Sequence, residues 1–440
     1  METILLKPPL TPSSHREPWR LGTHFITISS AAEARRLFGT PDAVARQRKS
    51  DLFYRGIEAR QRLPQGMHDR CEEFVYAAGH PSERDLAGLA KHLPLHYKVI
   101  RMHSHRLAAG EVWDLSVHHE EHWPELNELE ELYVFLQVDH LLLEEGASIL
   151  IRGNVLSLEC GTLERVSPHP CREPVTADQY DIGIFATPFS VDRATSPNTG
   201  AHGLAGAAEL QGAPGASAQI EGSLFGTRLV NTGTGGMVDT DSHGQDGGDA
   251  GPGGHGCRGH NGGMCRLADL RIGRLVGFDA NPLRLFSQAG EGYPGGDGGY
   301  GGRGGDGGDG GHGVQAINGS VPAGNGGDGG NGGDGGNGGH GGNGGISSNI
   351  FLQMHAQDCA HVQTLSLPSV GASGGRGGTG GLGGLGGKGG TLLQEAKHGK
   401  SGKTGRAGLN GVAGAPGKPR FGARIFVVPA SEQSDQKRIS

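Results

Sequence analysis

Glycine recurs at every third position through most of the second half of this chain, and this spacing constrains the fold more than any other feature. Of the 85 glycines, 74 lie between residues 200 and 440. Some stretches carry one glycine per triplet, as from Gly399 to Gly417, and others carry two, as from Gly326 to Gly345. A period of three is that of a polyproline-II type helix, which forms no internal hydrogen bonds. Its N–H and C=O groups therefore need partners on neighbouring chains.

Six such blocks follow one another, separated by intervals that contain apolar runs. Three alternatives fit the sequence less well. A collagen triple helix needs one long uninterrupted frame, whereas these blocks are interrupted. A calcium-binding nonapeptide solenoid needs an apolar residue in each repeat, and a disordered segment would lack strand-like runs such as residues 267–286. Only 34% of all residues are hydrophobic and 5% aromatic, so an apolar core is not what holds this half. We predict about six antiparallel polyglycine-II helices, each roughly 55–75 Å long at about 3.1 Å per residue.

The residues before position 200 follow other patterns. A capping box at residues 30–33 and a Gly-Thr-Pro sequence at 39–41 predict short helices. From residue 97 on, strand-like runs alternate with short turns, and the pattern around Gly110 returns around Gly146. Strands separated by turns at repeating intervals predict a β-solenoid-like or stacked β domain.

Together these patterns predict a mainly β or irregular protein with a small helical N-terminal part and a C-terminal bundle of polyglycine-II helices. The predicted domains are a helical docking and lead-in region (1–93), a β-rich domain (94–199), a glycine-rich sandwich (200–424), and a C-terminal strand and tail (425–440).

Short Gly-X-X helices laid antiparallel resemble the polyglycine sandwiches of phage long-tail-fibre tip adhesins. They are also similar, in period and number, to the snow flea antifreeze protein and to the amino-terminal domain of Obg-type GTPases. The resemblance covers residues 200 to about 420, and it implies a fold more than a function because these relatives do unrelated things. In the adhesins, loops at one end of the sandwich bind the receptor, which implies the same role for the segments between the glycine blocks here. The Obg resemblance is limited to the glycine-rich part, because these 440 residues contain no GTPase domain after it.

The outward positions of the doubled blocks are mostly polar, which argues against an ice-binding face. We expect them to form an exposed helix face, composed of Asp297, Tyr300, Arg303, Asp306, Asp309, Asn325, Asp328, Asn331 and Asp334. In the last block Lys400, Lys403 and Arg406 line one side, and we expect this basic face to pair with the Asp faces of neighbouring helices. The same stretch resembles the end of a phosphate-binding loop but lacks that motif's first glycine.

Four residues of zinc-binding type lie within eleven positions: His255, Cys257, His260 and Cys265. Two Cys and two His form a set that zinc accepts, so zinc or another transition metal is the alternative here, although no cofactor is assigned. The favoured interpretation is a set of outward polar side chains, since a three-residue frame places His255 and Cys257 on different faces. A second group of histidines, between residues 103 and 122, lacks the further ligands of a cupin metal site. No catalytic residues are assigned.

Bulk composition sets further bounds. The net charge of −7 is too mild to predict binding to nucleic acid. Six cysteines in 440 residues are too sparse for a disulfide framework, which favours a reducing compartment. No apolar run approaches the ~18 residues of a membrane span, and the first residues lack the plan of a signal peptide. The expected location is therefore cytoplasmic or particle-borne, as on a phage.

The expected function is that of a non-catalytic binding or structural protein similar to an adhesin. Its N-terminal region would dock to a larger protein assembly, and its loops would meet a cell-surface receptor or glycan. One alternative is a metal-dependent enzyme that uses the His-rich middle or the group from His255 to Cys265. Another is a scaffold subunit of a larger complex.

Overall fold

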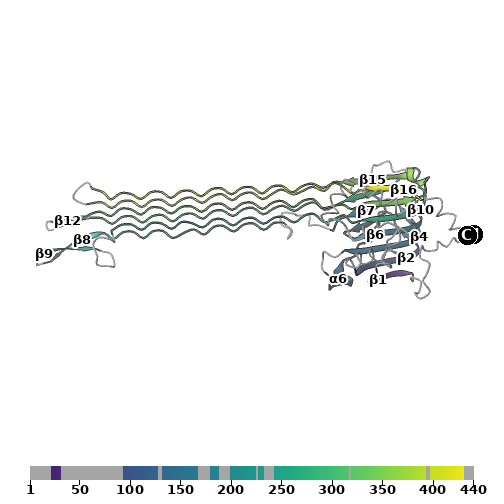
Figure 1. The fold of residues 1–440 in the computed structure, drawn as a ribbon, viewed down its shortest axis with the longest axis horizontal. Helices are drawn as coiled ribbons and strands as arrows, with labels where there is room; N and C mark the ends of the chain where they lie inside the picture. The colour runs from purple at the N-terminus through teal and green to yellow at the C-terminus, as the bar shows by residue number, and fades with distance from the viewer. Residues whose placement is uncertain are drawn as a thin grey trace, which may run out of the picture.

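The computed structural model describes residues 21–30, 93–126, 131–166, 179–187, 199–223, 226–231, 242–316, 319–392 and 397–430. The helices predicted between residues 31 and 92 lie outside these ranges. Figure 1 shows a stack of strands at one end of the molecule and a long shaft of extended, glycine-rich chains that projects from it.

Two sheets form the stack (Figure 1). In the seven-stranded sheet β1 is antiparallel to β2 and every other pair is parallel. The five-stranded sheet is parallel throughout. The first sheet has the order β1 (Gly22–Ile28), β2 (Leu95–Leu107), β4 (Leu132–Glu144), β6 (Val155–Val166), β10 (Ala268–Val276), β14 (Ile350–Met354), β16 (Ile425–Pro429). The second has the order β15 (Val362–Leu367), β11 (Leu283–Gln288), β7 (Ile182–Phe185), β5 (Ser148–Arg152), β3 (Val112–Asp114).

The chain alternates between the two sheets, because each strand from β2 to β14 in the first is followed along the chain by a strand of the second. Tight turns make two of these crossings possible. Gly110 and Gly146 both have a φ of 72°, a conformation that side chains rarely adopt. The two turns are stacked, since the N–H of Gly110 donates to the carbonyl of Glu145 at 2.9 Å.

One apolar core fills the space between the sheets. Val134, Leu136 and Val138 of β4 point into it, as the two-residue period of a strand requires. The next core residue on β4 is Leu141, and the inward row shifts at the same height in the neighbouring strands, because the pairing passes from Val138 directly to His140 on both sides of β4. Burying each such side chain contributes roughly 1.5–3 kcal/mol, so this core holds the base of the shaft in place.

Six extended glycine-rich segments make up the shaft. Segment 1 leaves the stack after β7 and segment 2 returns to β10, segments 3 and 4 connect β11 to β14, and segments 5 and 6 connect β15 to β16. Their ranges are 199–217, 242–264, 290–313, 322–346, 370–391 and 398–419 for segments 1 to 6.

The predicted fold class is wrong. The structure is mostly β with a mixed seven-stranded sheet, and its described part contains one α-helix, α6 (His119–His122), and one 3-10 helix, η2 (Asp358–His361). No C-terminal bundle of six helices is present in that part. The error has a physical origin. The apolar runs between segments 2 and 3 and between segments 4 and 5 are strands of the stack, so the glycine-rich chains are paired insertions between strands and not a separate helical bundle.

Hydrogen bonds between segments occur at every third residue and divide the shaft into two layers. Segments 1, 3 and 5 run parallel in one layer, where the N–H of Gly203 donates to the carbonyl of Asp297 at 2.8 Å. Segments 2, 4 and 6 form the other layer in the same way. Bonds across the layers join antiparallel chains, such as the one from Gly299 to Gly254 at 2.8 Å.

The number of glycines per triplet follows the number of neighbours. Segment 3 bonds to segments 1, 2, 4 and 5 and carries two glycines per triplet, whereas segment 1 bonds only to segments 2 and 3 and carries one. A Cβ on Gly301 would overlap the carbonyl oxygen of Gly333, far inside the 3.0 Å that real Cβ contacts respect. The glycines therefore mark the faces where backbones meet.

Candidate functional site

The end of the shaft far from the sheets gathers the three connections between outgoing and returning segments (Figure 1). The first is a hairpin of β8 (Ala218–Ser223) and β9 (Gly226–Asn231), and the second is a hairpin of β12 (Val314–Ala316) and β13 (Gly319–Val321). At the third, Thr391 and His398 form an isolated bridge. Ala218, Val314 and Val321 are buried together there. This distal end is thus a small packed unit held at a fixed distance from the stack.

The outward polar residues of the shaft have a structural role that the sequence analysis missed. In each layer the side chain at an outward position accepts the backbone N–H of the outward residue on the next segment. Asp306 Oδ1 accepts from Leu385 at 2.8 Å, and Asp334 Oδ1 accepts from Leu409 at 2.7 Å. We call this set of bonds the ladder. Its other acceptors among the predicted face residues are Asp297, Asp309, Asn325, Asp328 and Asn331.

The two remaining face residues take no part as acceptors. The Tyr300 side chain is 65% exposed, and Arg303 forms an ion pair with Asp306 at 3.1 Å. The predicted exposed face is therefore a mixture of hydrogen-bonded acceptors, one exposed tyrosine and one arginine that pairs with an acceptor.

Five histidines belong to the ladder, because imidazole Nδ1 occupies the place of an Asp or Asn δ-oxygen. His255 Nδ1, for example, accepts the N–H of Asn337 at 2.9 Å. A ring nitrogen accepts a hydrogen bond only while it carries no proton. Nδ1 of each of these rings is therefore unprotonated, and the ring proton lies on Nε2. The five ladder histidines are His202, His243, His255, His312 and His340.

Segments 5 and 6 end their layers, and their outward positions differ accordingly. Among the described residues no further segment lies beyond them to donate a ladder bond. At the positions that correspond to ladder acceptors they have no Asp, Asn or His, and the residues there are mainly Arg, Lys, Leu, Val and Thr. The sequence shows that the residues at every third position of segments 5 and 6 differ from those of segments 1 to 4. The reason for the difference is clear only once the structure shows that segments 5 and 6 are the last of their layers.

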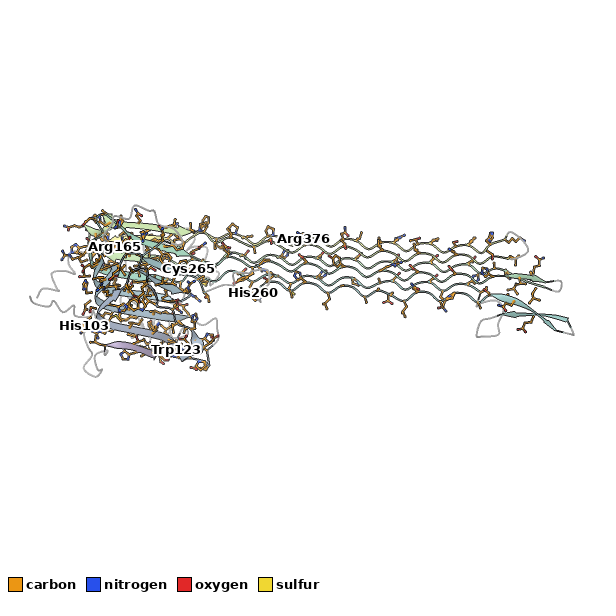
Figure 2. All side chains as sticks on the ribbon, turned by 180° about the vertical axis from the view of Figure 1, so that it is seen from behind. His103, Trp123, Arg165, His260, Cys265 and Arg376 are labelled. Atoms are coloured by element: carbon orange, nitrogen blue, oxygen red, sulfur yellow. The ribbon has the colours of Figure 1, made fainter. Side chains whose placement is uncertain are left out.

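The four predicted zinc ligands lie in different surroundings. His255 is occupied in the ladder, Cys257 is exposed, and Cys265 is fully buried, with its sulfur 3.2 Å from Ser287 Oγ. Figure 2 shows His260 on the extended chain and Cys265 where that chain enters the sheets. Among the described residues no group of three or more His, Cys, Asp or Glu is placed to hold a metal ion. Zinc binding stays an untested prediction.

The histidines of the β-rich middle form separate pairs. His103 Nδ1 lies 2.8 Å from Asp139 Oδ2, and these side chains are 65% and 41% exposed (Figure 2). His140 Nε2 lies 2.7 Å from Glu164 Oε2. The ring of His105 instead packs on Trp113. These contacts fix individual rings on the stack and bring no three ligands to one point.

Lys98 on β2 has a shifted pKa. Burial lowers the pKa of its ammonium, while the carboxylates of Asp114 and Glu121 act in the opposite direction. A shifted pKa often marks a functional group. Here Nζ donates to the carbonyls of Leu115 (3.0 Å) and Ser116 (3.2 Å), so the ammonium ties β2 to the segment after β3.

No protein-family model, curated protein or solved structure matches this chain. Nor does the described part of the chain contain a helix that combines the length and apolar character needed to cross a bilayer.

Proposed function

We propose that this protein is a non-catalytic binding or structural protein, similar in use to an adhesin, whose distal end contacts a receptor or glycan. The observation that carries the proposal is the shaft itself. Hydrogen bonds at every third residue tie six chains together, and they hold three connections at a distance of about 55–75 Å from the sheets, at about 3.1 Å per residue. Rigid presentation of loops is a means of recognition, because little conformational entropy is lost on binding.

The β8–β9 hairpin is the part of the distal end with the clearest contact surface. Ile220 is 41% exposed, and Gln219 and Glu221 beside it are exposed as well. In this proposal Ile220 and its two polar neighbours form the part of the hairpin that contacts the partner. In this proposal the stack is the base that a larger assembly would hold.

A binding screen on glycan arrays and intact cells tests this function. The variant Ile220→Asp changes the hairpin, and Leu204→Asp makes the same change at a shaft residue that is 82% exposed. We expect Ile220→Asp to weaken binding at least tenfold and Leu204→Asp to leave it within twofold. The proposal fails if the wild-type protein binds no cell surface or glycan, or if both variants bind as the wild type does.

A further inference from the structure

The edge of the shaft formed by segments 5 and 6 carries a charge opposite to that of the remainder. These two segments contain six Lys or Arg residues and no Asp or Glu. Segments 1 to 4 are predominantly acidic, with nine Asp or Glu against two Arg. The six cations are Arg376, Lys388, Lys400, Lys403, Arg406 and Lys418, and all are exposed. None of them forms an ion pair within the part of the chain that the structure describes.

Four of the cations gather near the distal end. Lys400, Lys403 and Arg406 lie on consecutive triplets of segment 6, about 9–10 Å apart at 3.1–3.4 Å per residue of extended chain. Segment 5 runs antiparallel beside them, with Gly402 donating to Gly387 and Gly405 to Gly384 at 2.8 and 2.9 Å. This register brings Lys388 to the same stretch.

Backbone donors are available at the same place. In segment 3 the first glycine of each triplet donates to segment 5, but segment 5 has no further neighbour in its layer. The side chains of Asn410 and Ser401 cap the N–H groups of Gly380 and Gly389. Between those two, the N–H groups of Gly383 and Gly386 have no hydrogen-bond partner among the described residues. Both lie at the height of Lys403 and Arg406.

The nearest acids lie one segment inward and are engaged. Asp328 Oδ1 accepts the backbone N–H of Lys403 at 2.7 Å, and Asp309 Oδ1 accepts that of Lys388 at 2.6 Å. The ladder thus holds these carboxylates toward the backbone, while the Lys and Arg side chains extend outward. We define the distal basic edge as Lys388, Lys400, Lys403 and Arg406 with the N–H groups of Gly383 and Gly386.

We propose that the distal basic edge binds a linear acidic polysaccharide that lies along the shaft. Cations and unpaired N–H groups are the donors that carboxylate and sulfate oxygens accept. The single row of widely spaced charges suits a chain with one acidic group on alternate sugars. A nucleic acid carries charges far more densely, one per about 1.7 Å of duplex, and would leave most of them without a partner. A second copy packed edge to edge would oppose like charges.

Apolar side chains continue the edge toward the sheets. Leu409 and Val412 follow Arg406 on the outward row of segment 6 and are 74% and 71% exposed. Leu382 and Leu385 of segment 5, 69% and 60% exposed, lie within the charged stretch at the height of Arg406 and Lys403. Sugar rings have apolar C–H faces that pack on such side chains, so the ligand contacts would extend beyond the charged stretch.

Binding of hyaluronan, which carries one carboxylate per disaccharide, to the full-length protein tests this inference at 25 and 150 mM salt. The triple variant Lys400→Gln/Lys403→Gln/Arg406→Gln should lose at least tenfold in affinity and keep the wild-type melting temperature. The wild-type affinity should fall with added salt. Arg258→Gln, which removes an exposed cation from segment 2, is the matched control and should bind within twofold of the wild type. Dextran, a neutral polysaccharide, should not bind.

Three outcomes overturn the inference: no binding of hyaluronan at 25 mM salt, equal losses in the triple variant and Arg258→Gln, or tighter binding of a single-stranded oligonucleotide. The inference rests on the proposed function only in that the protein is a binding protein. The two are separable, because Ile220→Asp changes the distal hairpin and should leave hyaluronan binding unchanged.

Discussion

Adding a single methyl group at the right glycine should destabilise the shaft, and two neighbouring glycines of segment 2 allow a matched comparison. A Cβ on Gly253 would overlap the carbonyl of Gly299, with 2.6 Å to its carbon. A Cβ on Gly251 would meet nothing closer than the Ala207 nitrogen at 3.5 Å, an ordinary van der Waals contact. The variants Gly253→Ala and Gly251→Ala therefore differ in one contact and in little else.

The magnitude follows from the hydrogen bonds that must lengthen. Moving the new Cβ from 2.6 to about 3.4 Å displaces one backbone by close to 1 Å. The bonds from Gly299 to Gly254 (2.8 Å) and from Gly302 to Gly251 (3.0 Å) would then exceed hydrogen-bond distance. Two to three such bonds, at about 0.5–1.5 kcal/mol each, amount to roughly 3 kcal/mol. For a cooperative unit of the size of the shaft, roughly 140 residues, each kcal/mol shifts the melting temperature by about 2–4 °C, so Gly253→Ala should lower the melting temperature of the shaft by roughly 6–12 °C.

Thermal denaturation followed by calorimetry checks this, with hydrogen exchange to locate the change in segments 2 and 3. Gly251→Ala should melt within about 2 °C of the wild type, or slightly above it, because alanine restricts the unfolded chain. Equal melting temperatures for the two variants would refute the view that close backbone contact is the reason for glycine in the shaft.

Three further predictions concern the ladder and the stack. Replacing Asn337 by Leu leaves the N–H of Val412 without its side-chain acceptor and should cost about 0.5–1 kcal/mol, whereas Asn337→Asp, which keeps a δ-oxygen, should melt like the wild type. Replacing all five ladder histidines by Leu removes their Nδ1 acceptors and should lower the melting temperature, because five backbone N–H groups lose their side-chain partners. Replacing them by Asn keeps a δ-oxygen acceptor at each place and should melt like the wild type, and equal melting temperatures for the two variants would contradict the role of the rings. Burial raises the pKa of the Cys160 thiol to about 12, so alkylation at pH 8 followed by mass spectrometry should modify exposed Cys257 and spare Cys160 until the protein unfolds.

The β-rich character of residues 95–166 could be predicted from the sequence, because apolar positions there alternate between glycine-containing turns. The three-residue period located the extended chains, but it does not by itself distinguish a helical bundle from insertions in a stack of strands. That distinction depends on residues 268–288 and 350–367, whose apolar runs resemble flanking strands equally well in both cases. Only the pairing of β10 with β6 and of β11 with β7, and then of β14 with β10 and of β15 with β11, decides between them.

The ladder could not be predicted from the sequence for a related reason. Sliding one glycine-rich segment by a triplet leaves the same glycines opposite one another, so the repeat alone does not fix the register. The strands at the base fix it, and only then does Asp306 meet Leu385 rather than another residue. For the same reason the sequence did not predict that Lys403 lies beside Gly386, because their proximity depends on the register of segments 5 and 6.

The paired insertions give the shaft a countable length. Every segment bonds to its neighbours triplet by triplet, so a triplet added to one segment alone would leave its groups without partners. Adding one triplet to all six at the same height would preserve each bond and move the distal end outward by about 9 Å. The base and the tip would be unchanged by such an addition. The length of the shaft therefore changes in steps of one triplet per segment, and related chains with shafts of different length would differ in multiples of eighteen residues.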